Sequence, residues 1–221
     1  MPVLNLEYGF LFACNPGTGS TSVSKVLINQ LNSQWFPEKS ITSCDVVMGF
    51  KHVPLRYIKQ NNLIDSTTFN KLFKFCFVRN PYTFLVSDYI RHKQWKELLD
   101  KPDSWIQNQP QAQERVKIAN SCSFQEYLEF KNRHRKENTT IELFAHQVEC
   151  TDKFYKLEEM DEFIRDFYDR FKVQLKMVTI NKTRKSTKLE DNQELLTKEV
   201  CEYINKIYEP SFTRYNYSQE I

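Results

Sequence analysis

The residues with the clearest chemical meaning lie in a short turn near the N-terminus. Proline, glycine and hydroxyl residues follow one another there: Pro16, Gly17, Thr18, Gly19, Ser20, Thr21 and Ser22. Glycines let a backbone approach a ligand closely, and the N–H groups and dipole at the start of a helix attract an anion. The turn therefore predicts a cradle for a phosphate or sulfate group. An ordinary strand-to-helix turn, with the hydroxyl residues as helix N-caps, would show the same pattern.

This turn lacks the lysine of a nucleoside triphosphatase loop. That motif reads Gly-x-x-x-x-Gly-Lys-[Ser/Thr], whereas Ser20 follows Gly19 here and the nearest lysine, Lys25, lies well inside the predicted helix. An enzyme that holds Mg²⁺ and a nucleoside triphosphate through a loop lysine is therefore disfavoured.

A second candidate for anion binding follows the apolar segment 72–78. Arg79 comes directly after this predicted strand, and Ser87 lies eight positions further on, about two turns into a helix at a rise of ~1.5 Å per residue. An arginine at a strand end can hold a phosphate through two parallel hydrogen bonds. It can equally cap carbonyl groups or pair with a carboxylate.

Two further basic groups stand in predicted loops. Lys51 and His52 follow the short apolar run 46–48, which predicts a strand, and the carboxyl ends of strands in open α/β sheets are where ligands bind. Arg184 and Lys185 belong to a polar loop rich in positive charge. From position alone, His52 is as readily a surface histidine, and the basic loop a solvated linker.

These residues need elements that hold them in place. Apolar runs predict strands at 8–13, 46–48, 72–78 and 150–157, and helical spacing predicts helices at 20–34, 55–63, 81–90, 123–130, 160–171 and 192–207. Strands that alternate with helices indicate an α/β fold with a parallel sheet flanked by helices. We expect one domain over residues 1–221. Segment 94–143 would be a helical and loop insertion, and a candidate acceptor-binding or lid region.

The composition excludes several classes of protein. The net charge of the 221 residues is +3, which does not favour a nucleic-acid binder, and the six scattered cysteines form no C-x-x-C pair for zinc or redox chemistry. No apolar run approaches the roughly 20 residues of a membrane span, and no signal segment is visible. We therefore expect a cytoplasmic protein with no metal site.

Taken in order, these pieces resemble the sulfotransferases that use 3′-phosphoadenosine 5′-phosphosulfate (PAPS), and most closely their carbohydrate-type branch. Phe10–Val23 resembles the family's 5′-phosphosulfate loop, Pro-[Lys/Arg]-x-Gly-[Ser/Thr]-Thr-Ser. Phe77–Tyr82 resembles its 3′-phosphate motif, F-x-R-[ND]-P with a serine eight residues after the arginine. Lys156–Glu158 is similar to an Arg-Phe-Glu segment of the family, and Asn181–Thr183 with Tyr208–Tyr217 resembles its closing motif.

The resemblance implies a P-loop-like α/β sulfotransferase fold. It implies that PAPS gives its sulfonate group to an acceptor hydroxyl, on a carbohydrate or small metabolite, and leaves as adenosine 3′,5′-bisphosphate (PAP), without a metal. Residues 16–22 would hold the 5′-phosphosulfate. Arg79 and Ser87, helped by Arg184 or Lys185, would hold the 3′-phosphate.

The catalytic residues implied by the resemblance are Lys51 and His52. In the carbohydrate-type branch, a histidine in a Lys-His context lies near the acceptor, so His52 is the candidate general base.

One position departs from the family pattern. The loop Lys or Arg of the family, which stabilises the oxygen that bridges phosphate and sulfate, falls at Gly17. Loss of one such electrostatic donor costs on the order of a hundredfold or more in rate. Either another cation replaces it, with Lys25, Lys51 and Arg91 as candidates, or turnover is slow. The remaining alternatives are a catalytically silent PAPS- or PAP-binding protein and, less favoured, a P-loop-type kinase.

Overall fold

The computed structural model describes residues 2–37, 41–43, 46–48, 52–134, 136, 139–178 and 190–220. The chain divides into two compact units. The first unit comprises Met1–Arg79 and Phe144–Lys182, and the second comprises Asn80–Leu143 and Thr183–Ile221.

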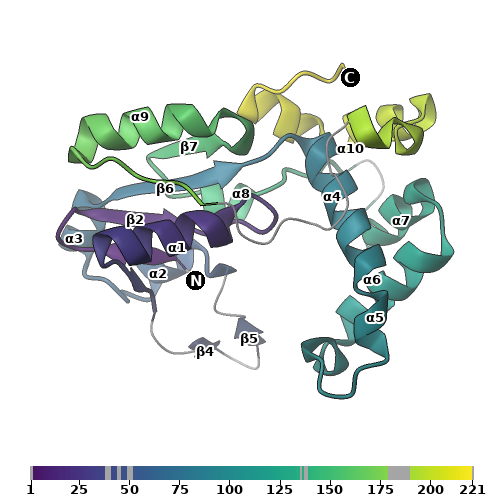
Figure 1. Cartoon of the computed structure of the whole chain (residues 1–221), viewed down its shortest axis with the longest axis horizontal. Coiled ribbons are helices and arrows are strands. Elements are labelled where there is room, and N and C mark those ends of the chain that lie inside the picture. Colours follow the sequence, from purple (N-terminus) through teal and green to yellow (C-terminus); the bar gives the residue numbers. More distant parts are fainter. Residues whose placement is uncertain are drawn as a thin grey trace. The chain divides into compact units, whose positions relative to one another are not determined.

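A five-stranded sheet forms the centre of the first unit, in the order β3-β1-β2-β6-β7 (Figure 1). Its strands are β1 Val3–Asn5, β2 Phe10–Ala13, β3 Gln34–Trp35, β6 Phe73–Val78 and β7 Lys153–Lys156. β2, β6 and β7 run parallel, with Ala13 opposite Cys76 and Cys76 opposite Phe154. This confirms the predicted α/β fold and its parallel strands. The sheet is nevertheless mixed, because β1 is antiparallel to β2 and β3. The connection from β1 to β2 is too short for the crossover that parallel strands require.

Helices cover both faces of this sheet. They are α1 Ser20–Leu31, α2 Leu55–Gln60, α3 Ser66–Lys71, α8 Ala145–Val148 and α9 Met160–Phe171, with the 3₁₀ turn η3 Leu157–Glu159. Phe10, Phe12, Phe75 and Phe77 share one face because successive side chains of a strand alternate. The apolar sides of α1 and α9 pack on these rings and form the core. On the opposite face, Lys74 donates hydrogen bonds to backbone carbonyls of the α3 region.

The predicted strand at 46–48 exists, but it does not belong to the main sheet. β5 Val46–Met48 pairs antiparallel with β4 Ile41–Ser43 in a separate two-stranded sheet. Only two residues connect β4 and β5, and so short a connection favours a hairpin. The sequence had suggested that His52 follows a strand of the main sheet. The structure shows that it does not, because β5 lies outside that sheet.

The second unit is helical in its described part. It contains α4 Pro81–Gln94, α5 Lys96–Leu99, η2 Trp105–Asn108, α6 Pro110–Ser121, α7 Phe124–Lys131, η4 Glu190–Leu195 and α10 Lys198–Tyr215. The Asn80 side chain caps α4 by accepting from the Tyr82 N–H at 2.9 Å, and Pro81 takes the first helical position. A capping box formed by Ser123 and Glu126 begins α7, within the helix predicted at 123–130.

Two expectations for the second unit are wrong. Residues 103–111, where no helix was predicted, form η2 and the start of α6. The last helix, expected to end near Ile207, continues to Tyr215. It bends at Tyr208, where φ is −104° and ψ is 17°, because Pro210 cannot donate a hydrogen bond to the preceding turn.

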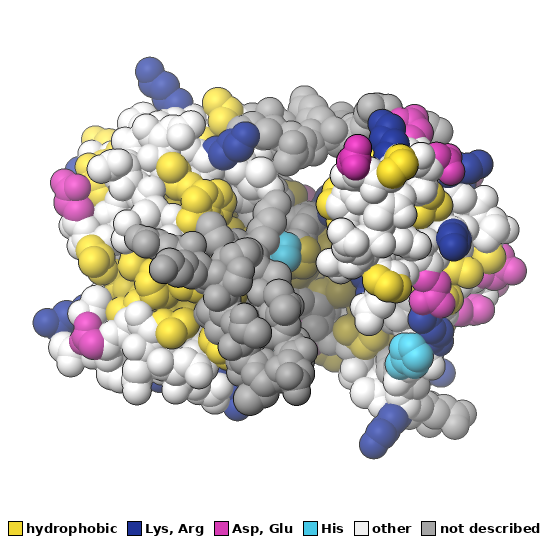
Figure 2. All heavy atoms as spheres, turned by 90° about the horizontal axis from the view of Figure 1, so that it is seen from below, with side chains coloured by type: hydrophobic (Ala, Val, Ile, Leu, Met, Phe, Trp, Pro, Cys, Tyr) yellow, Lys and Arg dark blue, Asp and Glu magenta, His cyan; other side chains and the backbone are white. Residues whose placement is uncertain are grey.

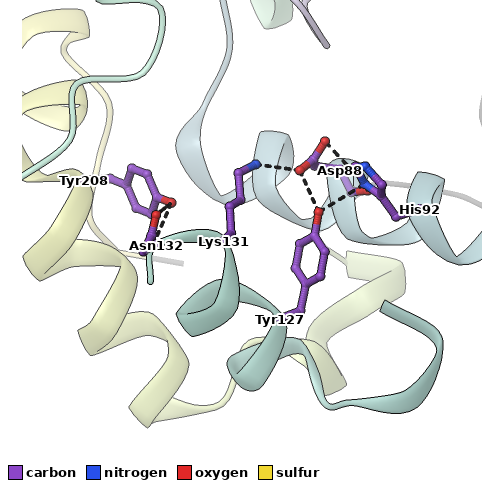
Figure 3. A network of polar contacts seen from close by, with 6 residues as sticks. All are labelled: Asp88, His92, Tyr127, Lys131, Asn132 and Tyr208. Atoms are coloured by element: carbon purple, nitrogen blue, oxygen red, sulfur yellow. Dashed lines mark hydrogen bonds and ion pairs between the residues drawn. The ribbon is translucent and has the colours of Figure 1, made fainter. Parts of the chain in front are cut away.

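A buried polar network joins α4 to α7 (Figure 3). Lys131 Nζ lies 2.5 Å from Asp88 Oδ2, and the Tyr127 hydroxyl donates to the same oxygen at 2.9 Å. Burial alone would raise the pKa of Asp88, but the charge and the hydrogen bond of Lys131 outweigh it and hold this pKa far below its ordinary value. Burial lowers the pKa of His92 and raises that of Tyr127, so both stay neutral near pH 7.

The outer surface carries charges of both signs. On the face drawn in Figure 2, basic and acidic side chains of the described residues are interspersed and do not gather into patches of one sign. Within the described ranges, no helix combines the length and the apolarity that a membrane crossing requires.

Candidate functional site

The turn before α1 and Arg79 lie at the same edge of the sheet. β2 and β6 are neighbouring parallel strands, so the segments that follow Ala13 and Val78 leave the sheet side by side. Arg79 Nη1 donates a hydrogen bond to the Gly17 carbonyl oxygen at 3.2 Å. The two segments predicted to bind the two ends of one doubly charged ligand are therefore neighbours in the first unit.

The turn requires glycine at two positions. Gly17 and Gly19 have φ of 73° and 69°, in the left-handed region that other residues avoid. A Cβ atom on Gly19 would lie 2.9 Å from Cδ1 of Leu157, so the turn also packs closely against η3. Gly17 and Gly19 thus shape the backbone of the predicted anion cradle.

The start of α1 differs from the expectation in one respect. The N-cap is Gly19, and not one of the hydroxyl residues Ser20, Thr21 and Ser22, which occupy the first helical turn. Within the described part of the chain no side chain caps this helix, and its first turn contains no acidic residue. The helix dipole at this end is therefore not offset by a carboxylate of the first turn, which is the condition that favours an anionic ligand.

Asn15 organises the turn, and sequence reasoning missed it. Its carbonyl oxygen accepts hydrogen bonds from the hydroxyls of Thr18 at 3.0 Å and Ser20 at 2.8 Å. Its side-chain Nδ2 donates to the carbonyl of Phe77, on the neighbouring strand, at 2.6 Å. Since a hydroxyl has one hydrogen, Ser20 can offer a ligand only its backbone N–H as a donor.

A repeated dipeptide could have drawn attention to Asn15. Asn-Pro follows both strands, as Asn15-Pro16 and as Asn80-Pro81. Asn80 caps its helix, whereas Asn15 ties the two strand ends together. Asn15 Oδ1 is buried and has no hydrogen-bond partner in the part of the chain that the structure describes.

His52 lies against the same edge. Its Nδ1 is 2.8 Å from the carbonyl oxygen of Cys14, the residue that follows β2. A carbonyl can only accept, so Nδ1 carries the hydrogen and Nε2 of the neutral ring carries the lone pair. The bond fixes both the tautomer and the orientation of the ring. His52 therefore reaches the predicted edge through a contact with the residue that follows β2, although β5 lies outside the sheet.

The other predicted residues lie outside the described part of the first unit. Ser87 belongs to α4 in the second unit, where its exposed fraction is 4%. Lys51, Arg184 and Lys185 lie outside the described residues. Among the described residues, no group of three or more His, Cys, Asp or Glu side chains could hold a metal ion.

Comparison with known proteins gives one match. No curated protein and no solved structure matched the chain. The family model described as "Sulfotransferase family" matches residues 3–218, which is nearly the whole sequence. This chain therefore belongs to the sulfotransferase family.

Proposed function

We propose that this protein transfers the sulfonate group of PAPS to a hydroxyl group of a carbohydrate or small metabolite and releases PAP. The observation that carries the proposal is the shared sheet edge, where the turn before α1 lies within one hydrogen bond of Arg79. A donor with charged groups at the 3′ and 5′ positions of one nucleoside needs two neighbouring anion sites. A helix start and an arginine are the groups that proteins use for this purpose.

Each part of the edge has a role in this proposal. The turn 16–22 holds the 5′-phosphosulfate through backbone N–H groups, and Arg79 holds the 3′-phosphate. A guanidinium has five N–H donors, so one arginine can bind a carbonyl group and a phosphate at the same time. The resemblance to the family motif also assigns Ser87, with Arg184 or Lys185, to the 3′-phosphate, and this assignment rests on the sequence pattern alone.

The reaction would proceed in line, as phosphoryl transfer does. The acceptor oxygen forms a bond to sulfur while the bond from sulfur to the bridging oxygen breaks, and that electron pair stays on the 5′-phosphate of PAP. His52 Nε2 takes the proton of the acceptor hydroxyl. Orientation and stabilisation of the leaving phosphate supply most of the acceleration. Lys51, next to His52 in the sequence, is a second catalytic candidate.

Gly17 supports a second candidate function. The loop cation of the family is replaced by a residue whose φ of 73° suits glycine. A protein that binds PAPS or PAP without turnover would not need this cation. A panel of hydroxyl acceptors with PAPS that carries radiolabelled sulfur separates the two functions, because nucleotide binding without any transfer supports the silent protein.

A binding experiment tests the nucleotide assignment without an acceptor. PAP and adenosine 5′-phosphate share the 5′ end and differ only in the 3′-phosphate. We expect the wild-type protein to prefer PAP, and Arg79→Ala to lose most of this preference. Hydrogen bonds to charged groups are worth about 1.5–3 kcal/mol, which predicts a loss of roughly tenfold to a hundredfold in the affinity ratio by calorimetry.

The ratio of the affinities for PAP and adenosine 5′-phosphate also controls for damage to the turn. Loss of the bond to Gly17 would weaken both nucleotides alike, whereas loss of a 3′-phosphate contact weakens PAP alone. Arg56→Ala is a matched control, because Arg56 is an exposed arginine of the first unit that pairs with Glu149 at 3.3 Å. An unchanged preference for PAP in Arg79→Ala would refute the 3′-phosphate assignment.

A further inference from the structure

A hollow of about 500 Å³ opens on the surface of the second unit. It lies along the loop that joins α5 to η2 and is lined by Leu98, Asp100, Lys101, Pro102, Asp103, Ser104 and Trp105. Its volume falls within the range of small-molecule sites, roughly 300–1,000 Å³. No step of the proposed reaction uses these residues.

Trp105 gives this hollow an exposed aromatic surface. About half of the residue, 52%, is accessible to solvent, which is unusual because tryptophan is highly buried on average. The indole is nevertheless held in place. It meets Trp95 edge to face, with ring centroids 5.0 Å apart, and Trp95 in turn packs edge to face on His92. Trp105 is therefore an ordered aromatic platform that faces water in part.

The loop that forms the rest of the hollow is also held in place. Nε2 of Gln107 lies within 3.3 Å of the carbonyl oxygens of Leu98, Leu99 and Lys101. Ser104 Oγ accepts from the N–H of Ile106, whose side chain is fully buried. A loop fixed by such bonds loses little conformational freedom when a ligand binds, so less binding energy is spent on ordering.

The charges of the hollow indicate the kind of ligand. The carboxylates of Asp100 and Asp103 outnumber the single ammonium group of Lys101, so the lining does not favour a phosphate, sulfate or uronate. Carboxylates are hydrogen-bond acceptors that suit hydroxyl donors. An aromatic face beside such acceptors matches a sugar ring, whose C–H face is apolar and whose rim carries hydroxyls.

We propose that this hollow is a binding site for a neutral pyranose ring. In this arrangement the ring packs on Trp105 and donates hydroxyl hydrogen bonds to Asp103 or Asp100. The inference rests on the proposed function in one respect, because it assigns the acceptor of that reaction to the neutral saccharides.

Saturation-transfer NMR and titration of tryptophan fluorescence with neutral disaccharides test the site. We expect binding to the wild-type protein, a loss of at least tenfold in affinity in Trp105→Ala, and most of the affinity kept in Trp105→Phe. Asp103→Asn should weaken binding less than Trp105→Ala does. Tyr168→Ala is the matched control, because Tyr168 is an aromatic residue of α9 with 46% exposure and should leave saccharide affinity unchanged.

Three results would overturn the proposal. They are the absence of saccharide binding, an affinity that Trp105→Ala leaves unchanged, and tighter binding of a uronate-containing disaccharide than of the neutral ones. The same preparations are titrated with PAP, which separates the two proposals. PAP binding without saccharide binding refutes only the saccharide site. Saccharide binding that depends on Trp105, without PAP binding, refutes only the donor assignment.

Discussion

The substitution Gly17→Lys tests whether the turn before α1 holds the bridging oxygen of PAPS. It restores the cation that the sulfotransferase pattern places at this position. Two effects oppose each other. A side chain in the left-handed region, as required by the φ of 73°, costs roughly 1–2 kcal/mol. An electrostatic donor at the leaving group is worth on the order of 10²–10³ in rate.

Gly17→Ala separates these effects, because alanine carries the same backbone strain without the charge. We expect both variants to be less stable than the wild-type protein by about 1–2 kcal/mol in urea unfolding, because both place a Cβ at positive φ. We expect Gly17→Lys to form PAP from PAPS about a hundredfold faster than Gly17→Ala with the same acceptor. Gly17→Asn should be more stable than Gly17→Ala, because asparagine tolerates positive φ better. It should form PAP no faster than Gly17→Ala, because it carries no positive charge.

The comparison between the two variants can refute the reasoning. If both fold and bind PAP, and Gly17→Lys is no faster than Gly17→Ala, then position 17 does not face the bridging oxygen. The alignment of this turn with the phosphosulfate loop of the family would then be wrong.

The other predictions concern the proposed base and the buried network. His52→Gln should lower the rate of sulfonate transfer by roughly a hundredfold or more, since general-base catalysis supplies a rate factor of about 10²–10⁴. PAP affinity should stay unchanged. Full activity of this variant would exclude His52 as the base. Lys131→Met should lower the free energy of unfolding by about 3–5 kcal/mol, because it leaves the carboxylate of Asp88 buried without its cation. The double variant that also carries Asp88→Asn should lose less stability, because no buried carboxylate remains. Equal losses in the two variants would contradict the ion-pair account. Stability should fall on acidification from about pH 7.5 to about pH 5.5, because the unfolded His92 takes up a proton near its ordinary pKa of about 6.5 while the folded pKa is lowered. The pH dependence of urea unfolding should become flatter in His92→Gln, and an unchanged dependence would assign the effect to other groups.

The elements that carry the predicted donor site could be predicted because their signals are local. β2 is a continuous apolar run and β6 is apolar except for Lys74, and α1 and α4 begin with residues that start helices. The edge strands β1 and β3 were missed, since two or three residues carry no periodic pattern. α6 was missed because few of its side chains are apolar and only Val116 and Ala119 are buried.

The features of the site and of the buried network that could not be predicted depend on contacts between residues far apart in the sequence. The predicted place of His52 at the sheet edge agrees with the structure, but the reason given was wrong, because the contact is to Cys14 and not through a sheet strand. The role of Asn15 depends on Phe77, far along the chain. The pairing of Asp88 with Lys131 likewise joins two helices that local patterns describe one at a time.

The contact between His52 and the Cys14 carbonyl offers a way to sort related chains. A glutamine or asparagine in place of the imidazole would still offer an N–H donor for this carbonyl, yet it would have no basic nitrogen. A family member with an amide side chain there is thus expected to hold its nucleotide and release it unchanged. Under the proposed reaction, a histidine whose ring is anchored in this way would distinguish the chains that transfer sulfonate from those that only bind the nucleotide.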